Sequence, residues 1–399
     1  MFCTINYNPY SMTGRMDITD LLARHKADGF MIVGNVDNAD FYYATNFFAS
    51  DKYTYIQTSG PKEILVVSEM EKGRAKLESR IADIRTLQDY NYAEKLKQRG
   101  DSYQAYTDCI AEILQKEGIR KLGIPRDFPY HIAQSLKEGG FTIIDMESPF
   151  RKLRSIKRED EVEHIRYAQK ACEKAMAAAI DLIHRSEMID GKLLFRGFEL
   201  TADDVRREID LVLLDSGCEA VGTIVACGQQ AANPHWEGEG PLKANEPIVI
   251  DIFPRSKKYR YFADMSRTVL KGEASPELQN MYDAVLAAQK EAIDMIKPGV
   301  LCSDIHNRVC DVLESHGFKT MRDGSKVGFI HSTGHGIGLE IHEAPFVGTQ
   351  AISLEKGNVI TIEPGLYYPD HGGIRIEDML LVTEDGCENL TSLEKRFLI

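Results

Sequence analysis

An internal repeat in the C-terminal part of the chain constrains its fold more than any other feature. The segment Pro247-Ile-Val-Ile-Asp251 resembles Val359-Ile-Thr-Ile-Glu363, and each predicts a strand that ends on an acidic residue. In this scheme the two return strands place Asp264 opposite Glu377. The offsets between the matched acidic residues, 112 and 113 positions, are almost equal. The sequence therefore predicts two similar half-domains, each with one carboxylate on the outgoing strand and one on the return.

These four carboxylates predict a metal site. An ionised carboxylate within an apolar run is costly unless it is paired or bound to a cation. Acidic residues that merely cap turns would account for Asp251 alone but not for matched pairs. Residues 330–343 add three histidines, His331, His335 and His342, and glycines that allow close backbone approach. Four carboxylates with one imidazole suit Mn, Co, Fe or Zn in a dinuclear site. Such a site generates a nucleophilic hydroxide, which predicts a two-metal hydrolase.

Length and composition set the class of protein. A chain of 399 residues is long enough for two to three domains. Its net charge of -13 and pI near 5.4 argue against a nucleic-acid-binding surface, which needs clustered Lys and Arg. No apolar run approaches the ~20 residues that cross a bilayer, and the N-terminus lacks a secretory pattern. The eight scattered cysteines are expected to be reduced thiols, so we expect a cytoplasmic protein.

The chain changes character near residues 150–161, a charge-dense stretch that leads into a long expected helix. Before it, helical and strand-like patterns alternate and predict an α/β domain with no catalytic cluster of its own. Asp37, Asp40 and the pair Tyr42-Tyr43 are interpreted as parts of one solvated loop. We place the domains at residues 1–154 and 155–399.

Several local patterns do not support other chemistries. His342-Glu343 is followed by Ala344-Pro345, which excludes the His-Glu-x-x-His helix of a zincin. The glycines of residues 334–338 lack the context of a dinucleotide fingerprint, and the chain has no Gly-x-Ser-x-Gly. The remaining helical histidines are predicted to be surface residues rather than ligands: His164, His184, His306 and His316.

The combined motifs resemble the pita-bread metallopeptidases, in particular the Xaa-Pro peptidase branch with aminopeptidase P and prolidase. The motifs that carry this resemblance are His331-Ser-Thr-Gly-His335-Gly-Ile-Gly-Leu-Glu-Ile-His342-Glu343, Thr361-Ile-Glu363-Pro-Gly365-Leu-Tyr367, Gly373-Ile-Arg375-Ile-Glu377-Asp378, Asn233-Pro234-His235 and Asp264-Met-Ser-Arg-Thr268. The resemblance implies an α/β N-terminal creatinase-like domain followed by an α+β pita-bread catalytic domain with an internal pseudo-two-fold repeat.

The resemblance also implies residue roles. The metal ligands would be Asp251, Asp264, His335, Glu363 and Glu377, with Asp264 and Glu377 bridging two divalent ions. The ions would be Mn(II), with Co(II) or Zn(II) as alternatives. His235 and His342 would contact the scissile peptide, and Glu363 would orient or deprotonate water. His331 would line the pocket for the proline ring, and Arg375 would hold the bridging carboxylates or the substrate.

By the same resemblance, the substrates would be small peptides with proline in the second position, and the protein would be a homodimer. Methionine aminopeptidase shares the five-ligand pattern and is the alternative activity, and a non-enzymatic peptide- or partner-binding protein of this fold is the other alternative. Three features depart from the family. The two aspartates lie 13 positions apart rather than eleven, Phe253 replaces a usual glycine, and residues 344–347 lack the arginine that clamps a dipeptide carboxylate in some prolidase-like members.

Overall fold

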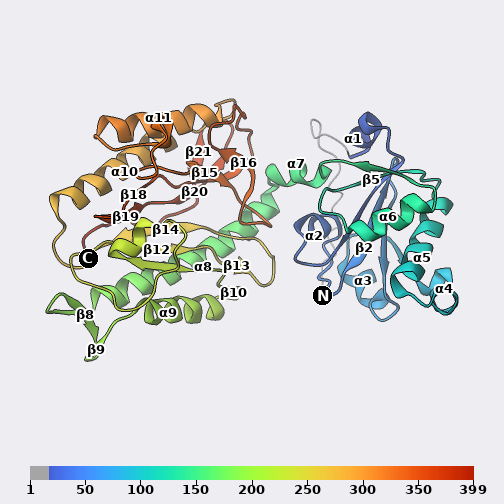
Figure 1. Ribbon diagram of the computed structural model, residues 1–399, viewed down its shortest axis with the longest axis horizontal. Helices are drawn as coiled ribbons and strands as arrows, with labels where there is room; N and C mark the ends of the chain where they lie inside the picture. Colours follow the sequence, from blue (N-terminus) through green and yellow to red (C-terminus); the bar gives the residue numbers. More distant parts are fainter. Residues whose placement is uncertain (1–17) are drawn as a thin grey trace, which may run out of the picture. The chain divides into compact units, whose positions relative to one another are not determined.

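The computed structural model describes residues 18–399, and its contacts divide the chain into two units between Leu153 and Arg154 (Figure 1). Each unit is described by itself below. The seven cysteines within residues 18–399 are all free. Cys3 and the N-terminal segment considered above lie outside the described residues. No helix in residues 18–399 has the length and apolarity that crossing a membrane would require.

The first unit is built on one mixed six-stranded sheet with the order β4-β3-β2-β1-β5-β6. Strands β1, β5 and β6 run parallel, as do β3 and β4, while β2 is antiparallel to both of its neighbours. The strands are β1 (Gly29–Gly34), β2 (Tyr53–Thr58), β3 (Glu63–Val67), β4 (Asp83–Thr86), β5 (Lys121–Ile124) and β6 (Thr142–Asp145).

Helices pack on both faces of this sheet and form two separate apolar cores. One core includes Leu22, Phe41 and Ala75 from the first three helices, and the other includes Ile110 and Leu136 from later helices. This α/β arrangement confirms the predicted class of the N-terminal part. The helices are α1 (Ile18–His25), α2 (Ala39–Thr45), α3 (Lys72–Glu78), η1 (Gln88–Tyr90), α4 (Tyr92–Arg99), α5 (Ser102–Lys116), α6 (Tyr130–Glu138) and α7 (Pro149–Ser155).

The predicted loop at residues 37–43 is wrong, because most of it belongs to helix α2. The Asn38 side chain caps this helix by accepting a hydrogen bond from the Phe41 backbone N–H at 2.8 Å. Phe41 and Ala44 are fully buried. The polar residues Asp37, Asn38 and Asp40 are thus the N-terminal signal of a short amphipathic helix rather than a solvated loop.

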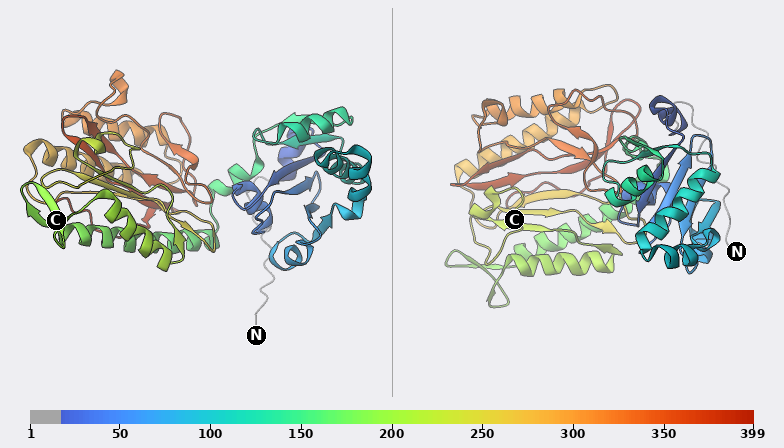
Figure 2. Two further views of the ribbon diagram at one scale, coloured as in Figure 1. Left: turned by 60° about the horizontal axis from the view of Figure 1, so that its bottom comes forward. Right: turned by 45° about the vertical axis from the view of Figure 1, so that its right-hand side comes forward.

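The second unit places strands between two helix pairs, as the views in Figures 1 and 2 show. Helices α8 and α9 pack together on one side, and helices α10 and α11 pack together on the other. The first pair accompanies the sheet β11-β12-β14, and the second accompanies the sheet β16-β15-β17-β20-β21. This repeat of a helix pair with a sheet confirms the predicted pseudo-two-fold organisation. The helices are α8 (Glu159–His184), α9 (Ala202–Asp215), α10 (Pro276–Met295) and α11 (Cys302–Ser315).

The strands that carry the repeat are fully buried and rich in Ile and Val, as expected for a sheet covered on both faces. Shorter strands and single helical turns lie in the connections between them. The principal strands are β11 (Ile224–Cys227), β12 (Ile248–Ile252), β14 (Met265–Val269), β15 (Gly334–Gly336), β16 (Glu343–Val347), β17 (Val359–Ile362), β20 (Asp378–Val382) and β21 (Cys387–Asn389). The others are β7 (Glu187–Ile189), β8 (Lys192–Phe195), β9 (Phe198–Glu199), β10 (Cys218–Glu219), β13 (Arg255–Ser256), β18 (Gly365–Tyr368), β19 (Gly372–Arg375), η2 (Gly228–Ala232) and η3 (Met321–Asp323).

The strand registers bring the acidic residues to the same place. Asp251 pairs with Ser266, so Asp264 lies just before strand β14. Ile362 pairs with Asp378, so Glu363 and Glu377 flank the ends of β17 and β20. The Glu377 backbone N–H donates to the Ser266 carbonyl at 3.1 Å, which links the two halves. The longer hairpin at residues 254–260 contains β13, which pairs with β10.

Candidate metal centre

Three predicted ligands from different elements converge at the centre of the second unit. Atoms of Asp264, His335 and Glu377 that can bind a metal all lie within 4.8 Å of one another. The His335 Nε2 atom lies 3.6 Å from Asp264 Oδ2 and 3.5 Å from Glu363 Oε1. Asp264, His335 and Glu377 are buried, and the Glu363 side chain is 17% exposed. The fifth predicted ligand, Asp251, is buried in β12 and belongs to the same cluster through Arg375.

Close backbone packing fixes the strand that carries His335. The Thr361 hydroxyl oxygen accepts from the His335 backbone N–H at 3.2 Å, and the Thr333 carbonyl accepts from the Glu363 N–H at 2.8 Å. A Cβ atom on Gly334 would stand 1.9 Å from the Thr361 carbonyl oxygen, so only glycine fits there. The glycine beside this histidine therefore lets strand β15 approach β17, as the sequence indicated.

The protonation of His335 suits a metal ligand. Its Nδ1 lies 3.0 Å from the Gly336 carbonyl oxygen, which can only accept, so Nδ1 carries the proton. Burial lowers the pKa of His335 to about 4, so the ring is neutral near pH 7 and Nε2 has a bare lone pair. That lone pair faces the oxygens of Asp264 and Glu363. A cation between these atoms would remove their mutual repulsion.

The carboxylates themselves disfavour one another without a cation. Burial, followed by the charges of neighbouring carboxylates, raises the pKa values of Asp264 and Glu377 well above their usual range. Burial also raises the pKa of Glu363 to about 8 against the opposing effect of Arg375. Four acidic groups in this small space cannot all be ionised at low cost unless positive charge is supplied.

Two unpaired oxygens show that the residues fit a metal. Within residues 18–399, the buried atoms Asp251 Oδ1 and Glu377 Oε1 have no hydrogen-bond partner. Buried carboxylate oxygens are normally paired or bound to metal. The donor set of carboxylate oxygens and one imidazole nitrogen suits a divalent ion of the Mn, Co, Fe or Zn type. Both the positions of these atoms and their chemical type therefore fit a divalent metal ion.

Arg375 positions two of the carboxylates. The sequence interpretation had it hold the bridging carboxylates Asp264 and Glu377 or the substrate, whereas its direct carboxylate partner is Asp251. Its Nη2 donates to Asp251 Oδ2 at 2.8 Å, and not directly to Asp264 or Glu377. Its Nε donates to the Ser266 hydroxyl at 2.8 Å, and this hydroxyl donates to Glu377 Oε2 at 3.0 Å. One buried guanidinium thus orients carboxylates from both halves. Sequence reasoning included Ser266 in a motif but assigned it no role, because a serine hydroxyl in a strand does not reveal its partners.

A second missed residue, Tyr367, joins Arg375 to His331. Arg375 Nη1 donates to the Tyr367 hydroxyl at 3.0 Å, and that hydroxyl lies 3.0 Å from His331 Nε2. His331 Nδ1 is protonated because it contacts the Ser332 carbonyl at 2.7 Å. Burial, followed by the charge of Arg375, lowers the pKa of His331 to about 3, so Nε2 accepts from Tyr367. His331 is therefore a neutral, fixed ring beside the cluster.

The other two predicted catalytic histidines lie at the exposed side of the cluster. The rings of His342 and His335 form an edge contact with centroids 4.5 Å apart. Burial, followed by the nearby charge of His235, lowers the pKa of His342. His235 is exposed in the turn after η2. These two exposed imidazoles are open to solvent, in contrast to the half-buried His331 and the buried His335.

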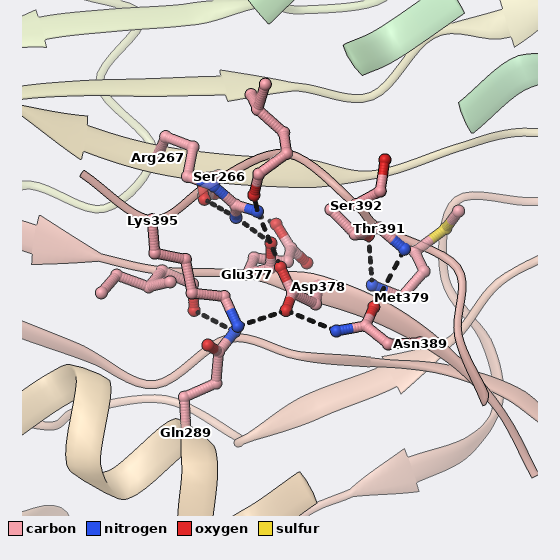
Figure 3. Close-up of polar contacts among 12 residues, drawn as sticks. Ser266, Arg267, Gln289, Glu377, Asp378, Met379, Asn389, Thr391, Ser392 and Lys395 are labelled. Carbon is pink, nitrogen blue, oxygen red and sulfur yellow. Dashed lines mark hydrogen bonds and ion pairs between the residues drawn. The ribbon is translucent and has the colours of Figure 1, made fainter. Parts of the chain in front are cut away.

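A network of polar contacts supports Glu377 from its backbone side (Figure 3). Arg267 is fully buried, and its Nη1 donates to the Glu377 carbonyl at 2.6 Å. Its Nη2 donates to Asp378 Oδ1 at 2.9 Å. Asp378 also accepts from Asn389 and forms an ion pair with Lys395. The acidic residue beside Glu377 is thus a structural anchor between β14 and β20.

The prediction that His306 lies on the surface is wrong. His306 on α11 is 2% exposed, and its Nδ1 lies 2.9 Å from the Thr333 hydroxyl. The apolar residues Val309 and Cys310, three and four positions further on, are the signal that could have placed it on the buried face. Glu343, the other residue of the excluded zincin pattern, lies in strand β16 and pairs with Arg154 at 2.8 Å and Lys157 at 3.2 Å. It stabilises the unit instead of binding the metal.

Comparisons with known proteins agree with this description. Residues 163–384 match Metallopeptidase family M24, and residues 16–156 match the Creatinase/Prolidase N-terminal domain. The chain belongs to metallopeptidase family M24, and the divalent-metal chemistry of that family fits its residues. The sequence is 32% identical to the Xaa-Pro dipeptidase of Pyrococcus horikoshii over 86% of this chain and 88% of the relative.

Solved structures resemble the whole chain. The prolidase from Pyrococcus furiosus has a TM-score of 0.78 at 27% identity and covers 95% of this chain and 100% of its own. The Xaa-Pro dipeptidase from Bacillus anthracis has a TM-score of 0.79 at 25% identity and covers 95% of this chain and 97% of its own. These likenesses confirm the predicted fold class, a creatinase-like domain followed by a pita-bread catalytic domain.

Proposed function

We propose that the protein is a metal-dependent peptidase that hydrolyses the bond between an N-terminal residue and a following proline. The observation that carries this proposal is the buried cluster of carboxylates around the neutral His335 in a chain of family M24. The relatives named Xaa-Pro dipeptidase and prolidase support the proline specificity. Proline gives a tertiary amide without an N–H, which makes a dedicated site plausible.

We infer that the cluster holds two divalent ions, preferably Mn(II), with Co(II) or Zn(II) as alternatives. When bound, such ions supply Lewis acidity and lower the pKa of water. The side chains that would hold them are Asp251, Asp264, His335, Glu363 and Glu377. Asp264 and Glu377 would bridge, which is supported by their position within 4.8 Å of each other and of His335.

The remaining residues would act on the peptide. Glu363 would take a proton from the attacking water, because its carboxylate adjoins the cluster and its environment favours the protonated form. His342 and His235 would donate to the carbonyl oxygen as negative charge develops there. His331 would face the proline ring, since its own polar atoms are already hydrogen-bonded. Arg375 would hold Asp251 and, through Ser266, Glu377.

The substrates would be small peptides with proline in the second position, and the protein would act as a cytoplasmic homodimer that binds neither nucleic acid nor membrane. Light scattering tests the dimer, since a monomeric mass would contradict it. The domain limits 1–154 and 155–399 stay a prediction, and limited proteolysis near residue 154 would test them.

Hydrolysis of a matched peptide set tests the proposed function. Mn(II)-loaded and chelator-treated protein would be assayed with Ala-Pro, Ala-Pro-Ala, Met-Ala-Ser and Ala-Ala. We expect metal-dependent cleavage of the proline peptides alone. Cleavage confined to Met-Ala-Ser would instead assign a methionine aminopeptidase. No cleavage with any metal would favour a peptide-binding protein of this fold.

A further inference from the structure

The second unit contains a pocket of about 180 Å³, lined in part by Ser332, which follows His331 in the chain. It is formed where α11, η3 and the segment before β15 meet the end of β16. Its walls combine the apolar side chains of Met321 and Phe346 with uncharged polar groups. The residues that line it include His306, Met321, Ser332, Phe346, Thr349 and Gln350. None of the ligands or imidazoles considered above occupies this pocket apart from His306, whose ring forms part of its lining.

The pocket begins one residue beyond His331. Ser332 lines it and its carbonyl accepts the His331 Nδ1–H at 2.7 Å. Thr333 contacts His306 through its hydroxyl and Glu363 through its backbone carbonyl. Ser332 and Thr333 therefore link the pocket wall, through the chain and these hydrogen bonds, to His331 and Glu363.

Strand β16 provides a second route from the cluster to the pocket. It is the edge strand of its sheet, and its odd-numbered residues are buried while Ala344 and Phe346 are exposed. His342, which contacts His335, comes just before it, and Phe346 lines the pocket. His342 and Phe346 are at most about 13 Å apart along the strand. Two extended peptide residues with one side chain can cover such a distance.

The backbone of β16 also directs Phe346 outward. Gly336 pairs with Glu343 and Gly334 pairs with Val347, so four steps along β16 match two steps along β15. Such a bulge re-aims side chains and is common beside active sites. Phe346 is 48% exposed, because the alternation along β16 places it on the same face as Ala344.

The lining has no charge that could bind a carboxylate. No lysine or arginine side chain lines the pocket among residues 18–399. Arg322 follows Met321, but its guanidinium is held by Asp311 at 2.6 Å and by the Asn307 carbonyl at 2.7 Å. His306 is hydrogen-bonded to Thr333 and buried. The pocket is therefore suited to an uncharged apolar group and poorly suited to the free C-terminus of a dipeptide.

We propose that this pocket binds the side chain of the residue that follows proline, and that the protein prefers peptides of three or more residues with an apolar residue in the third position. This proposal rests on the proposed Xaa-Pro hydrolysis. In that function the proline ring faces His331, and the next residue of the peptide is the one that would reach the pocket. Phe346 is the specificity-determining residue. It acts by covering the third side chain and does not contact the reacting bond.

The test compares Ala-Pro-Leu with Ala-Pro-Ala on the Mn(II)-loaded full chain. We expect kcat/KM about 10-fold or more higher for Ala-Pro-Leu, the size expected for a side chain in an apolar pocket. Phe346→Ala should bring this ratio close to one, mainly by lowering kcat/KM for Ala-Pro-Leu. The control is Phe198→Ala, which removes another exposed phenylalanine of the same unit and should keep the wild-type ratio.

A ratio near one in the wild type, or a ratio that Phe346→Ala does not change, would overturn the proposal. Leu-Pro-Ala is the positional control. If Phe346→Ala changes the preference for Leu-Pro-Ala over Ala-Pro-Ala instead, the pocket binds the residue before proline and the assignment is wrong. Failure of the proposed function is distinguishable, because Ala-Pro-Ala and Ala-Ala-Ala would then be cleaved equally or not at all. In that case the affinities of the protein for Ala-Pro-Leu and Ala-Pro-Ala, measured by calorimetry, would test the apolar preference of the pocket without hydrolysis.

Discussion

The two halves of the second unit share one framework but not one chemistry. Asp251 on β12 and Glu363 after β17 occupy equivalent places, and so do Asp264 and Glu377. The neighbouring strands differ. Ala226 of β11 pairs with Val249, whose counterpart is Thr361, and Thr361 hydrogen-bonds to His335. The first half therefore has a methyl group where the second half has the imidazole.

The two halves also differ two residues away along the same strands. Ile224 pairs with Asp251 in the first half, and Thr333 bonds to Glu363 in the second. Thr333 contacts the buried His306, whereas Ile224 belongs to a small apolar cluster. Repetition thus supplies the carboxylate frame, and the asymmetry of one strand supplies the nitrogen ligand and the pocket beside it. Under the proposed function, metal binding would therefore draw on carboxylates of both halves, whereas the imidazole ligand would come from the second half alone.

Removing one carboxylate from either half tests the shared role most directly. Glu377→Gln and Asp264→Asn keep the shape of each side chain but remove its charge. We expect each to lose activity by well over the 10²-fold typical of residues that only support ligands, and to weaken metal binding. Elemental analysis after dialysis and the rate on Ala-Pro-Ala are the measurements. Glu384→Gln, an exposed glutamate of the same unit, is the control. Full activity in either variant would contradict the bridging assignment.

The sequence predicted those features that repeat or that carry a distinctive motif. The strands with Asp251 and Glu363 were found because apolar runs end on an acid twice at one spacing, and the structure confirms these elements. Ser266 and Tyr367 were missed because their roles depend on contacts with Arg375, which come together only in the folded unit. His306 was misplaced although Val309, Cys310 and Leu313 follow it at three, four and seven positions, a spacing that puts it on the apolar face of α11.

Breaking the contact that joins the halves should affect stability more than chemistry. Arg267 of β14 pairs with Asp378 of β20, and their repeat counterparts are Leu380 and Met265, so this ion pair has no equivalent. Arg267→Met removes the buried ion pair, so that the Asp378 carboxylate keeps only its contacts with Lys395 and Asn389. We expect a loss of about 3 kcal/mol in the free energy of unfolding, at the lower end for a broken buried pair. Urea denaturation measures it.

An exposed ion pair provides the control for this variant. Arg308→Met breaks the pair with Glu291, in which both side chains are nearly half exposed. Exposed pairs contribute about 0 to 1 kcal/mol, so little change is expected. Equal losses in the two variants would show that Arg267 does not anchor the halves.

Truncating His342 should separate catalysis from metal binding. This imidazole belongs to the second half and contacts His335 by its ring edge, but it adjoins the exposed side of the cluster. We expect His342→Ala to keep its metal content and to lower kcat by about 10²-fold, as for the loss of one transition-state donor. His371→Ala removes another exposed histidine of the unit and should retain wild-type kcat. Loss of metal in His342→Ala would reassign it as a ligand.

The stability of the metal-free protein should also depend on pH, through carboxylates that both halves contribute. Without metal, the pKa of Glu363 is about 8, against 4.5 for an unperturbed glutamate, mainly because it is buried. The folded metal-free protein therefore holds a proton that the unfolded chain releases. Its stability falls as the pH rises from about 4.5 to 8, by up to about 1.4 kcal/mol per pH unit for one such group.

Metal binding should reverse this trend, because the ions need deprotonated ligands and bind more tightly as the pH rises. We expect the difference in melting temperature between Mn(II)-loaded and chelator-treated protein to widen between pH 5.5 and pH 8. Calorimetry at several pH values measures it. Glu363→Gln has no carboxyl group to titrate, so its metal-free form should have a shallower slope, with Glu384→Gln as the unchanged control. A slope that Glu363→Gln leaves intact would place the proton on Asp264 or Glu377 instead.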